Sequence, residues 1–434
     1  MSRHRSVRVV AFLAMLSASG LFADVRATEQ QLGQMLYLDT NLSLHRNQSC
    51  NSCHDIQAVR LQGRSTALPA AGFVDPDNVR DGSAVSKGSI AGVSGTLNAP
   101  SVGYARFSPA FHWDEGEGLY IGGQFWNGRA ATLAEQAMGP PLNPREMAMP
   151  SQWAVVSRLR ENPVYVAQFR TLYDIDLEAI PANATASSEL KPPPGVEEAY
   201  ARMAQAIAAF EKGRFFNRFT AKYDFVMAGF TEFTEQERAG LELFNNEQSQ
   251  CSDCPPSAPL ETPDGGYLPP LFTDFSYDNL GLPRNLNIPG NPEPDPGLGG
   301  RSDIAARDPD GQELGKHKVM GLRNIAVTAP YMHNGVLATL ADVVHFYNTR
   351  DSKPRTCRDT NDAGFGEDCW PAPEVARNVN VEELGDLGLA EEQEQALVAF
   401  MHTLTDGYPE WGKDPKVPPG TASPFAGTAF PPAP

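Results

Sequence analysis

The sequence predicts a mainly α-helical protein, built as two tandem copies of one domain with long loops. Apolar residues recur at spacings of three and four along residues 196–210, which is the period of an amphipathic helix. A nine-residue segment starting at Asn127 recurs at Asn334 with six identical positions. Glycine and proline supply 38 and 37 of the 434 residues, so much of the chain must be loop.

Residues 1–27 have the pattern of a secretory signal peptide. A basic start is followed by an apolar run at 9–23, which is too short to span a bilayer comfortably, and then by small residues. We expect cleavage near residues 23–27 and export to the periplasm. No later segment is long and apolar enough to span, so no membrane insertion is expected.

The net charge of −18 argues against nucleic acid and anionic membranes as partners. It suits a basic protein partner, but a solvated acidic surface that only keeps the protein soluble explains the charge equally well.

The segment Cys50-Asn51-Ser52-Cys53-His54 carries the strongest chemical signal in the chain. C-x-x-C-H is the attachment site of a c-type haem, because two thiols bind the two vinyl groups and the next imidazole lies under the iron. A zinc ribbon would need a second C-x-x-C about 15–20 residues away. A redox C-x-x-C would lie near a βαβ pattern, which the sequence lacks. We therefore expect a covalent haem whose iron is bound by His54.

A second pair, Cys251 and Cys254, keeps the thiol spacing but is followed by Pro255 instead of histidine. Proline has no side-chain donor atom for iron. The pair is either a degenerate haem site or a disulfide, and the spacing alone does not decide between them.

The third pair, Cys357 and Cys369, has no haem or metal spacing. In an oxidising compartment it is expected to form a disulfide that closes a short loop, with a stabilisation of about 3 kcal/mol.

The repeat links these motifs. The segments at Asn127 and Asn334 are offset by 207 residues and the two C-x-x-C pairs by 201, so the chain is predicted to be a tandem duplication of a cytochrome c-like haem domain. We expect domains at 28–233 and 234–417, and a disordered tail at 418–434 that is rich in proline, glycine, alanine and serine. The offset of 207 pairs Tyr347, whose oxygen can ligate iron, with Pro140, which cannot. Tyr347 could instead be a core aromatic, which is the favoured interpretation when this residue is taken in isolation.

Together these motifs resemble the bacterial di-haem cytochrome c peroxidase and MauG family. The resemblance is carried by CNSCHD at 50–55, LNAPSV at 97–102, FWNGRAATLAEQAMGPPLNPREM at 125–147 and LRNIAVTAPYMHNGVLATLADVVHFYN at 322–348. In such proteins the first haem reacts with peroxide and the second relays electrons.

The resemblance assigns roles residue by residue. Trp126 would lie between the haems, and Gln136, Pro140 and Glu146 would form the distal pocket, with Glu146 as the acid–base residue. Further assignments are Asn98 as a ligand of a calcium ion, Tyr347 as the distal ligand of the second haem and His333 as a histidine near that haem. Each of these residues could instead have an ordinary packing or surface role.

Two positions depart from the family pattern. Ala70 stands where classical peroxidases have a histidine that caps the first iron, which agrees with an open first haem. Pro255 removes the proximal ligand of the second haem, whose attachment normally requires the complete C-x-x-C-H. Of the two outcomes, we expect no haem at Cys251 and Cys254. The alternative is a haem held by thioethers with Tyr347 as its only nearby ligand.

The expected function is that of an oxidoreductase that uses hydrogen peroxide. Its electron donor would be a small cytochrome or a cupredoxin, or it would oxidise a protein substrate, as the Tyr347 ligand suggests. The resemblance also allows a homodimer. The rival hypothesis is a non-catalytic mono-haem electron carrier or haem-binding protein that remained after the second site decayed.

Overall fold

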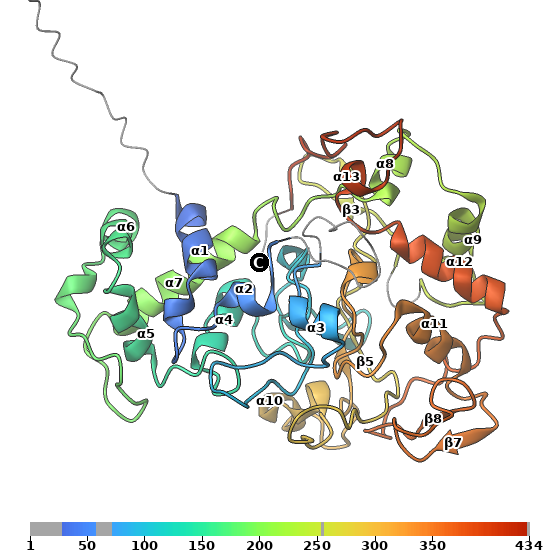
Figure 1. The fold of residues 1–434 in the computed structure, drawn as a ribbon, viewed down its shortest axis with the longest axis horizontal. Coiled ribbons are helices and arrows are strands. Elements are labelled where there is room, and N and C mark those ends of the chain that lie inside the picture. The colour runs from blue at the N-terminus through green and yellow to red at the C-terminus, as the bar shows by residue number, and fades with distance from the viewer. Residues whose placement is uncertain (1–27, 58–71, 253–255, 432–434) are drawn as a thin grey trace, which may run out of the picture.

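The computed structural model describes residues 28–57, 72–252 and 256–431, and it is helix-rich with few strands (Figure 1). The predicted mainly α class is confirmed. The predicted signal peptide, Ala70, Cys254 and Pro255 lie outside the described residues. The α-helices are α1 (Glu29–Leu38), α2 (Cys50–Cys53), α3 (Pro76–Asp81), α4 (Leu133–Ala137), α5 (Gln152–Leu159), α6 (Pro163–Tyr173), α7 (Val196–Glu211), α8 (Lys222–Met227), α9 (Glu235–Phe244), α10 (Ser302–Ala305), α11 (Leu340–Thr349), α12 (Glu391–His402) and α13 (Tyr408–Trp411).

The strands of the described residues pair two by two and build no larger sheet. Three pairs are antiparallel and the pair β7–β8 is parallel. The strands are β1 (His112–Asp114), β2 (Leu119–Ile121), β3 (Leu260–Glu261), β4 (Tyr267–Leu268), β5 (Tyr277–Asp278), β6 (His317–Lys318), β7 (Arg355–Cys357) and β8 (Cys369–Pro371).

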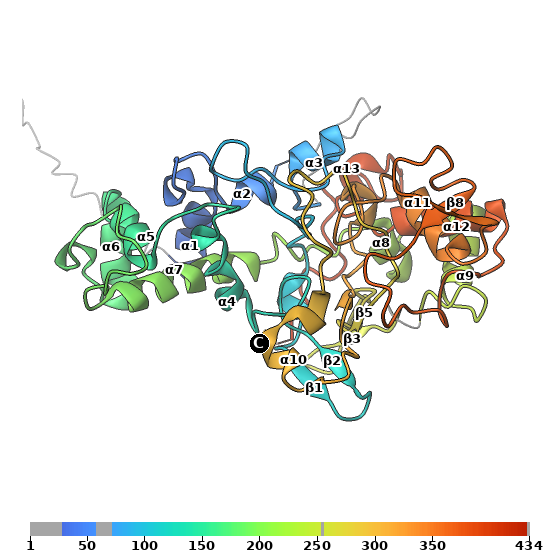
Figure 2. The same cartoon turned by 90° about the horizontal axis from the view of Figure 1, so that it is seen from below.

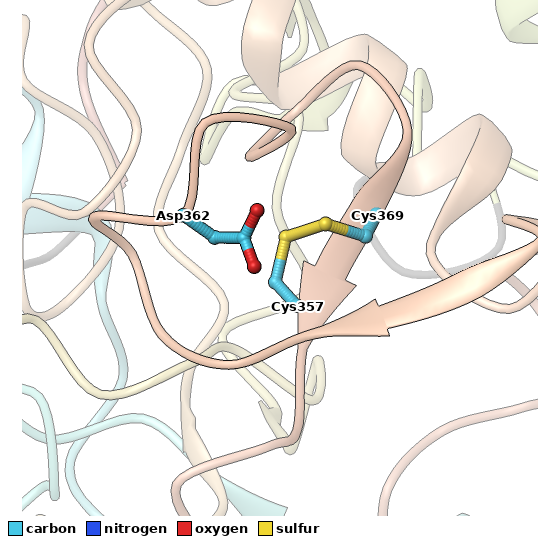
Figure 3. Close-up of side chains that lie close together, drawn as sticks. All are labelled: Cys357, Asp362 and Cys369. Carbon is cyan, nitrogen blue, oxygen red and sulfur yellow. A yellow bond between two sulfur atoms is a disulfide. The ribbon is translucent and has the colours of Figure 1, made fainter.

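The predicted disulfide between Cys357 and Cys369 is confirmed and joins β7 to β8 (Figure 3). Asp362 lies beside the two sulfurs and forms an ion pair of 2.8 Å with Arg355. Because both sulfurs are bonded to each other, this group offers no thiolate to a metal ion.

The first hydrophobic core surrounds the crossing of α1 and α7, at one end of the molecule (Figure 1). Gly33 permits the close approach, because a Cβ at this position would lie 1.8 Å from the carbonyl oxygen of Ala206. Phe210 continues the contact with Tyr37, at a ring separation of 5.4 Å.

The second core surrounds the crossing of α9 and α12, at the other end of the molecule (Figure 1). Here Gly240 faces Ala396, and a Cβ would lie 1.9 Å from the carbonyl oxygen. Phe400 packs on Phe244 at 5.3 Å. The two helix crossings therefore have the same arrangement. In each, a glycine of one helix contacts an alanine carbonyl of the other, and a phenylalanine one turn after that alanine extends the contact.

The turns that lead into α4 and α11 also recur. The backbone bridge between Gln124 and Ala130 has its counterpart 207 residues later, between Tyr331 and Leu337. Thr132 and Thr339 cap the following helices by accepting hydrogen bonds from the backbone three residues on. These recurrences support a tandem duplication. The domain boundaries given above stay predictions.

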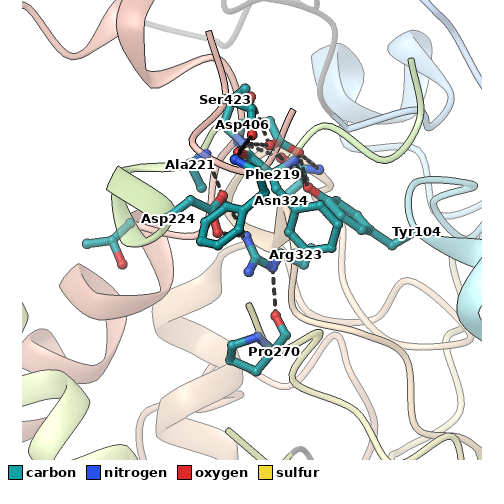
Figure 4. Close-up of polar contacts among 12 residues, drawn as sticks. Tyr104, Phe219, Ala221, Asp224, Pro270, Arg323, Asn324, Asp406 and Ser423 are labelled. Atoms are coloured by element: carbon teal, nitrogen blue, oxygen red, sulfur yellow. Dashed lines mark hydrogen bonds and ion pairs between the residues drawn. The ribbon is translucent and has the colours of Figure 1, made fainter. Parts of the chain in front are cut away.

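Buried polar contacts join the two halves (Figure 4). The Tyr104 hydroxyl of the first half donates to Asp406 of the second half at 2.9 Å. Beside this contact, Arg323 donates to both oxygens of Asp224 at 2.8 and 2.9 Å; Asp224 is in α8, which packs with the second core through Tyr223. The side chains of Arg323 and Asp224 are 1% and 0% exposed. A fully buried pair of this kind is strongly destabilising to break.

The tail prediction is wrong for residues 418–431. Phe425 and Phe430 pack against the cluster around Tyr104 and Phe219, and Arg106 donates to the carbonyl of Pro431 at 2.9 Å. Composition suggested disorder, but these two phenylalanines give the tail apolar anchors. Across the described part of the chain, no helix combines the length and apolarity needed to cross a membrane.

Candidate functional site

The C-x-x-C-H segment forms the single-turn helix α2, which ends at His54. The backbone N–H of Ser49 donates to the Ser52 hydroxyl at 3.0 Å and fixes the start of the turn. Neither Cys50 nor Cys53 is in a disulfide. The helical turn therefore presents both thiols and the imidazole from one short segment, as thioether attachment of haem requires.

His54 is held in the tautomer that an iron ligand needs. Its Nδ1 lies 3.4 Å from the carbonyl oxygen of Phe73, so a proton on Nδ1 leaves the lone pair on Nε2. The Tyr37 hydroxyl donates to the His54 carbonyl at 2.6 Å. Burial lowers the pKa of His54 to about 4, so the ring is neutral near pH 7.

A cavity of about 350 Å³ opens beside this segment. Its wall brings Cys53 and His54 together with Gln136, Pro140 and Glu146, which belong to a distant segment of the sequence. The predicted attachment site and the predicted distal residues therefore share one cavity. We refer to it as the first cavity.

Glu146 is half-buried in the wall of the first cavity. Asn143 donates a hydrogen bond of 2.5 Å to its Oε1. Burial raises the pKa of Glu146, while the Asn143 hydrogen bond and the charge of Arg129 act in the opposite direction. A carboxyl group whose protonated form is favoured in this way is suited to taking up and returning a proton.

Trp126 lies between two cavities and lines both. Its indole nitrogen donates to the Asn98 carbonyl at 2.9 Å, and its ring meets the His333 ring edge-on at 6.3 Å. The Asn98 amide nitrogen donates to the carbonyl of Ala84 at 3.0 Å. The assignment of Asn98 as a calcium ligand stays a prediction.

The second cavity measures about 220 Å³ and is mostly apolar. Cys251 and Tyr347 both line it, so the structure brings the remaining described cysteine of the second motif and the predicted ligand to one place. Apolar side chains of the second core supply most of the rest of its wall, including Leu340, Val344, Leu397 and Met401.

Sequence reasoning missed two polar residues between the cavities. His317 stacks on His333 with ring centroids 3.6 Å apart, and it contacts Asp295 at 3.1 Å. Lys318 lines both cavities, and burial lowers its pKa to about 7. Its ammonium group donates to the Ser108 hydroxyl at 2.5 Å. Neither His317 nor Lys318 belongs to a motif, so the sequence did not indicate that both side chains are buried.

The chain is similar to several known proteins. Residues 27–232 match the model of a family described as di-haem cytochrome c peroxidase. The methylamine utilization protein MauG of Paracoccus denitrificans is 37% identical over 401 residues, which cover 90% of this chain and 93% of that protein. The cytochrome c peroxidase Ccp of Escherichia coli is 30% identical over 321 residues, which cover 73% of this chain and 52% of that protein.

Solved structures agree with these similarities. The diheme peroxidase BthA from Burkholderia thailandensis matches with a TM-score of 0.69 and 31% identity, over 91% of this chain and 89% of that one. A MauG-like protein associated with microbial copper homeostasis matches with a TM-score of 0.58 and 26% identity, over 88% of this chain and 90% of that one.

Proposed function

We propose that this protein reacts with hydrogen peroxide in the first cavity. The premise is its family: the chain belongs to the di-haem cytochrome c peroxidase and MauG family and is a haem oxidoreductase. The observation that carries this proposal is the shared wall of that cavity, where Cys53 and His54 meet Gln136, Pro140 and Glu146. We further propose that the protein acts in the periplasm after removal of residues 1–27.

The donor set fits a covalent haem. Cys50 and Cys53 would form the two thioethers, and the neutral imidazole of His54 would bind the iron through Nε2. When bound, haem supplies the electron-transfer chemistry that peroxide reduction requires. The Phe73 carbonyl holds the His54 ring in orientation, as a hydrogen-bond partner of an iron-bound histidine does.

On the peroxide side, Pro140 offers no donor atom, so that part of the wall leaves room for a small molecule. Glu146 would remove a proton from one peroxide oxygen and deliver it to the other, and Gln136 would hold the peroxide by hydrogen bonding. Overall, one hydrogen peroxide takes up two protons and two electrons and yields two waters.

Trp126 would pass electrons between the cavities if the second cavity also held a haem, and without that haem it would lose its relay partner. Its ring contributes to both walls, and its indole N–H is fixed by the Asn98 carbonyl. The electrons would come from a small cytochrome, a cupredoxin or a protein substrate. Tyr347 in the second cavity favours oxidation of a protein over simple removal of peroxide.

Two arrangements are open at the second cavity. Attachment normally requires the complete C-x-x-C-H, so we propose that Cys251 and Cys254 carry no haem when Pro255 follows them. The apolar lining and Tyr347 support the alternative, a haem held by thioethers. If the second haem is absent, the second candidate function is that of a non-catalytic mono-haem electron carrier. Pro255 favours this function because it replaces the histidine ligand of the second haem. Counting covalent haems by mass spectrometry of the mature protein decides between the two arrangements.

The proposed function has a direct spectroscopic test. The ferric first haem should be high-spin, with His54 as its only protein ligand, and it should react rapidly with hydrogen peroxide in a stopped-flow experiment. A purely low-spin spectrum, or no reaction with peroxide, would contradict the proposal. Calcium at Asn98 and a homodimer are further proposals, which metal analysis and sedimentation would check.

A further inference from the structure

The β1–β2 hairpin presents a tryptophan at the protein surface. This residue lies outside both C-x-x-C motifs. Trp113 is 42% exposed, although an indole ring gains little from contact with water. It lies directly across the hairpin from Tyr120, with ring centroids 4.9 Å apart. Figure 2 shows the hairpin at the edge of the molecule, beside α10.

Aromatic rings continue inward from Trp113 without a gap. Tyr120 stacks on Phe111 at 5.1 Å with an interplanar angle of 8°. Phe111 meets Tyr277 edge-on at 5.9 Å. Tyr277 is buried, and its hydroxyl donates to the Gly122 carbonyl at 2.5 Å. The series therefore runs from solvent into the region between the two halves.

The inner end of the series lies against the segment of Trp126. Tyr277 pairs with Lys318 in the β5–β6 ladder, and the Lys318 N–H donates to the Trp126 carbonyl at 2.8 Å. Gly128 packs so closely on Tyr277 that a Cβ there would lie 2.0 Å from the phenol oxygen. Hydrogen bonds and tight contacts thus connect the last ring to the residue that lines both cavities.

We propose that Trp113 is a surface redox site, through which a protein donor delivers electrons to the first cavity by way of Tyr120, Phe111 and Tyr277. This proposal rests on the proposed peroxide reaction. Each hydrogen peroxide withdraws two electrons, one at a time. On each pass Trp113 gives up one electron inward and regains one from the donor, so the indole returns to its starting state. The two protons that complete the two waters come from solvent.

Phe111 acts as a bridge in this route and not as a site where charge rests. The Arg301 guanidinium lies 4.1 Å from the Phe111 ring centroid, and a cation at that position disfavours a positive charge on the ring. Tyr120 and Tyr277 on either side are more easily oxidised than a phenylalanine.

The donor that fits this surface is a basic protein. Asp114, Glu115 and Glu117 are all in the hairpin, and Glu115 and Glu117 are exposed beside Trp113. The chain as a whole carries a net charge of −18. Opposite charge at the rim of a contact raises the rate of encounter, and it does so less at high salt.

The test compares Trp113→Phe with Trp153→Phe, a matched change at another tryptophan with a solvent-accessible ring in α5. Phenylalanine keeps an aromatic ring on Tyr120 but is far harder to oxidise. Two rates are measured on the holoprotein: that of the spectral reaction with peroxide alone, and that of the peroxide-dependent oxidation of a reduced basic cytochrome c. The second rate is measured at low and at high salt. Paramagnetic resonance then seeks a tryptophan radical after peroxide is added without a donor.

We expect Trp113→Phe to leave the reaction with peroxide alone unchanged, to slow oxidation of the basic cytochrome several-fold and to lose the tryptophan radical. Trp153→Phe should resemble the wild type. The pair Glu115→Gln and Glu117→Gln leaves all rings in place and should slow the same oxidation mainly at low salt.

If Trp113→Phe matches Trp153→Phe in every measurement, the rings only stabilise the hairpin and this inference is wrong, while the proposed function stands. If the wild type does not react with peroxide at all, the proposed function fails and this inference fails with it.

Discussion

The substitution Pro255→His completes the second C-x-x-C-H motif and should add one covalent haem to the protein. The second cavity already has the wall that such a group needs, with Cys251 and Tyr347 lining a mostly apolar space. The variant should also show a second redox transition, because a second iron would then be present.

The stability of the variant follows from the size of the cavity. Filling an apolar cavity of about 220 Å³, at about 24 cal/mol for each Å³, should raise the free energy of unfolding by about 5 kcal/mol. A typical domain has a total stability of about 5–15 kcal/mol, so this increase is readily measured. A smaller gain would mean that the walls close on each other when no haem is bound.

The assay combines intact-mass measurement, a redox titration and denaturant unfolding followed by circular dichroism. Pro256→His is the matched control, since it adds the same side chain one residue beyond the motif spacing. An unchanged haem count in Pro255→His would refute the reasoning that the site lacks only its ligand. Two covalent haems in the unmodified chain would instead show that the thioethers alone suffice.

Three further predictions concern residues outside the second motif. Glu146→Gln should slow the reaction with peroxide roughly 100-fold or more. Burial raises the pKa of Glu146, so the wild-type rate should increase with pH as this carboxyl group ionises. The rate of the variant, measured by stopped flow, should not show this increase. Asp224→Asn leaves the Arg323 charge buried without its partner. It should lower the free energy of unfolding, measured with denaturant, by about 3–5 kcal/mol. A decrease of under about 1 kcal/mol would contradict this account. Replacing both Cys357 and Cys369 by alanine should cost about 3 kcal/mol without changing the haem count, and a changed haem spectrum would show that the β7–β8 loop affects a cavity.

The candidate first haem site could be recognised from the sequence, because covalent attachment requires a contiguous motif. Residues 50–54 are the whole attachment segment. The distance to the next C-x-x-C pair argued against a zinc ribbon, and the lack of a βαβ pattern argued against a thiol redox site. Gln136 and Glu146 were reached only through the resemblance, because no local pattern marks them, whereas Pro140 was also reached through the internal repeat that pairs it with Tyr347.

The rest of the candidate site depends on burial, which a single sequence does not encode locally. His317 and Lys318 read as ordinary polar residues in a loop, yet they lie between the cavities. The tail from 418 to 431 has the composition of a disordered segment, but Phe425 and Phe430 pack against a cluster that residues far apart in the sequence, such as Tyr104, Phe219 and Leu271, form together.

The buried hydrogen bonds of Asp406 have a mechanical consequence. This carboxylate is fully buried and accepts from the Tyr104 hydroxyl at 2.9 Å and from the Asn324 amide at 3.0 Å, so it joins the two halves. Rotating one half against the other would leave a buried polar group without its partner, at a cost of about 1–3 kcal/mol. The contact therefore opposes hinge motion that would change the separation between the two cavities.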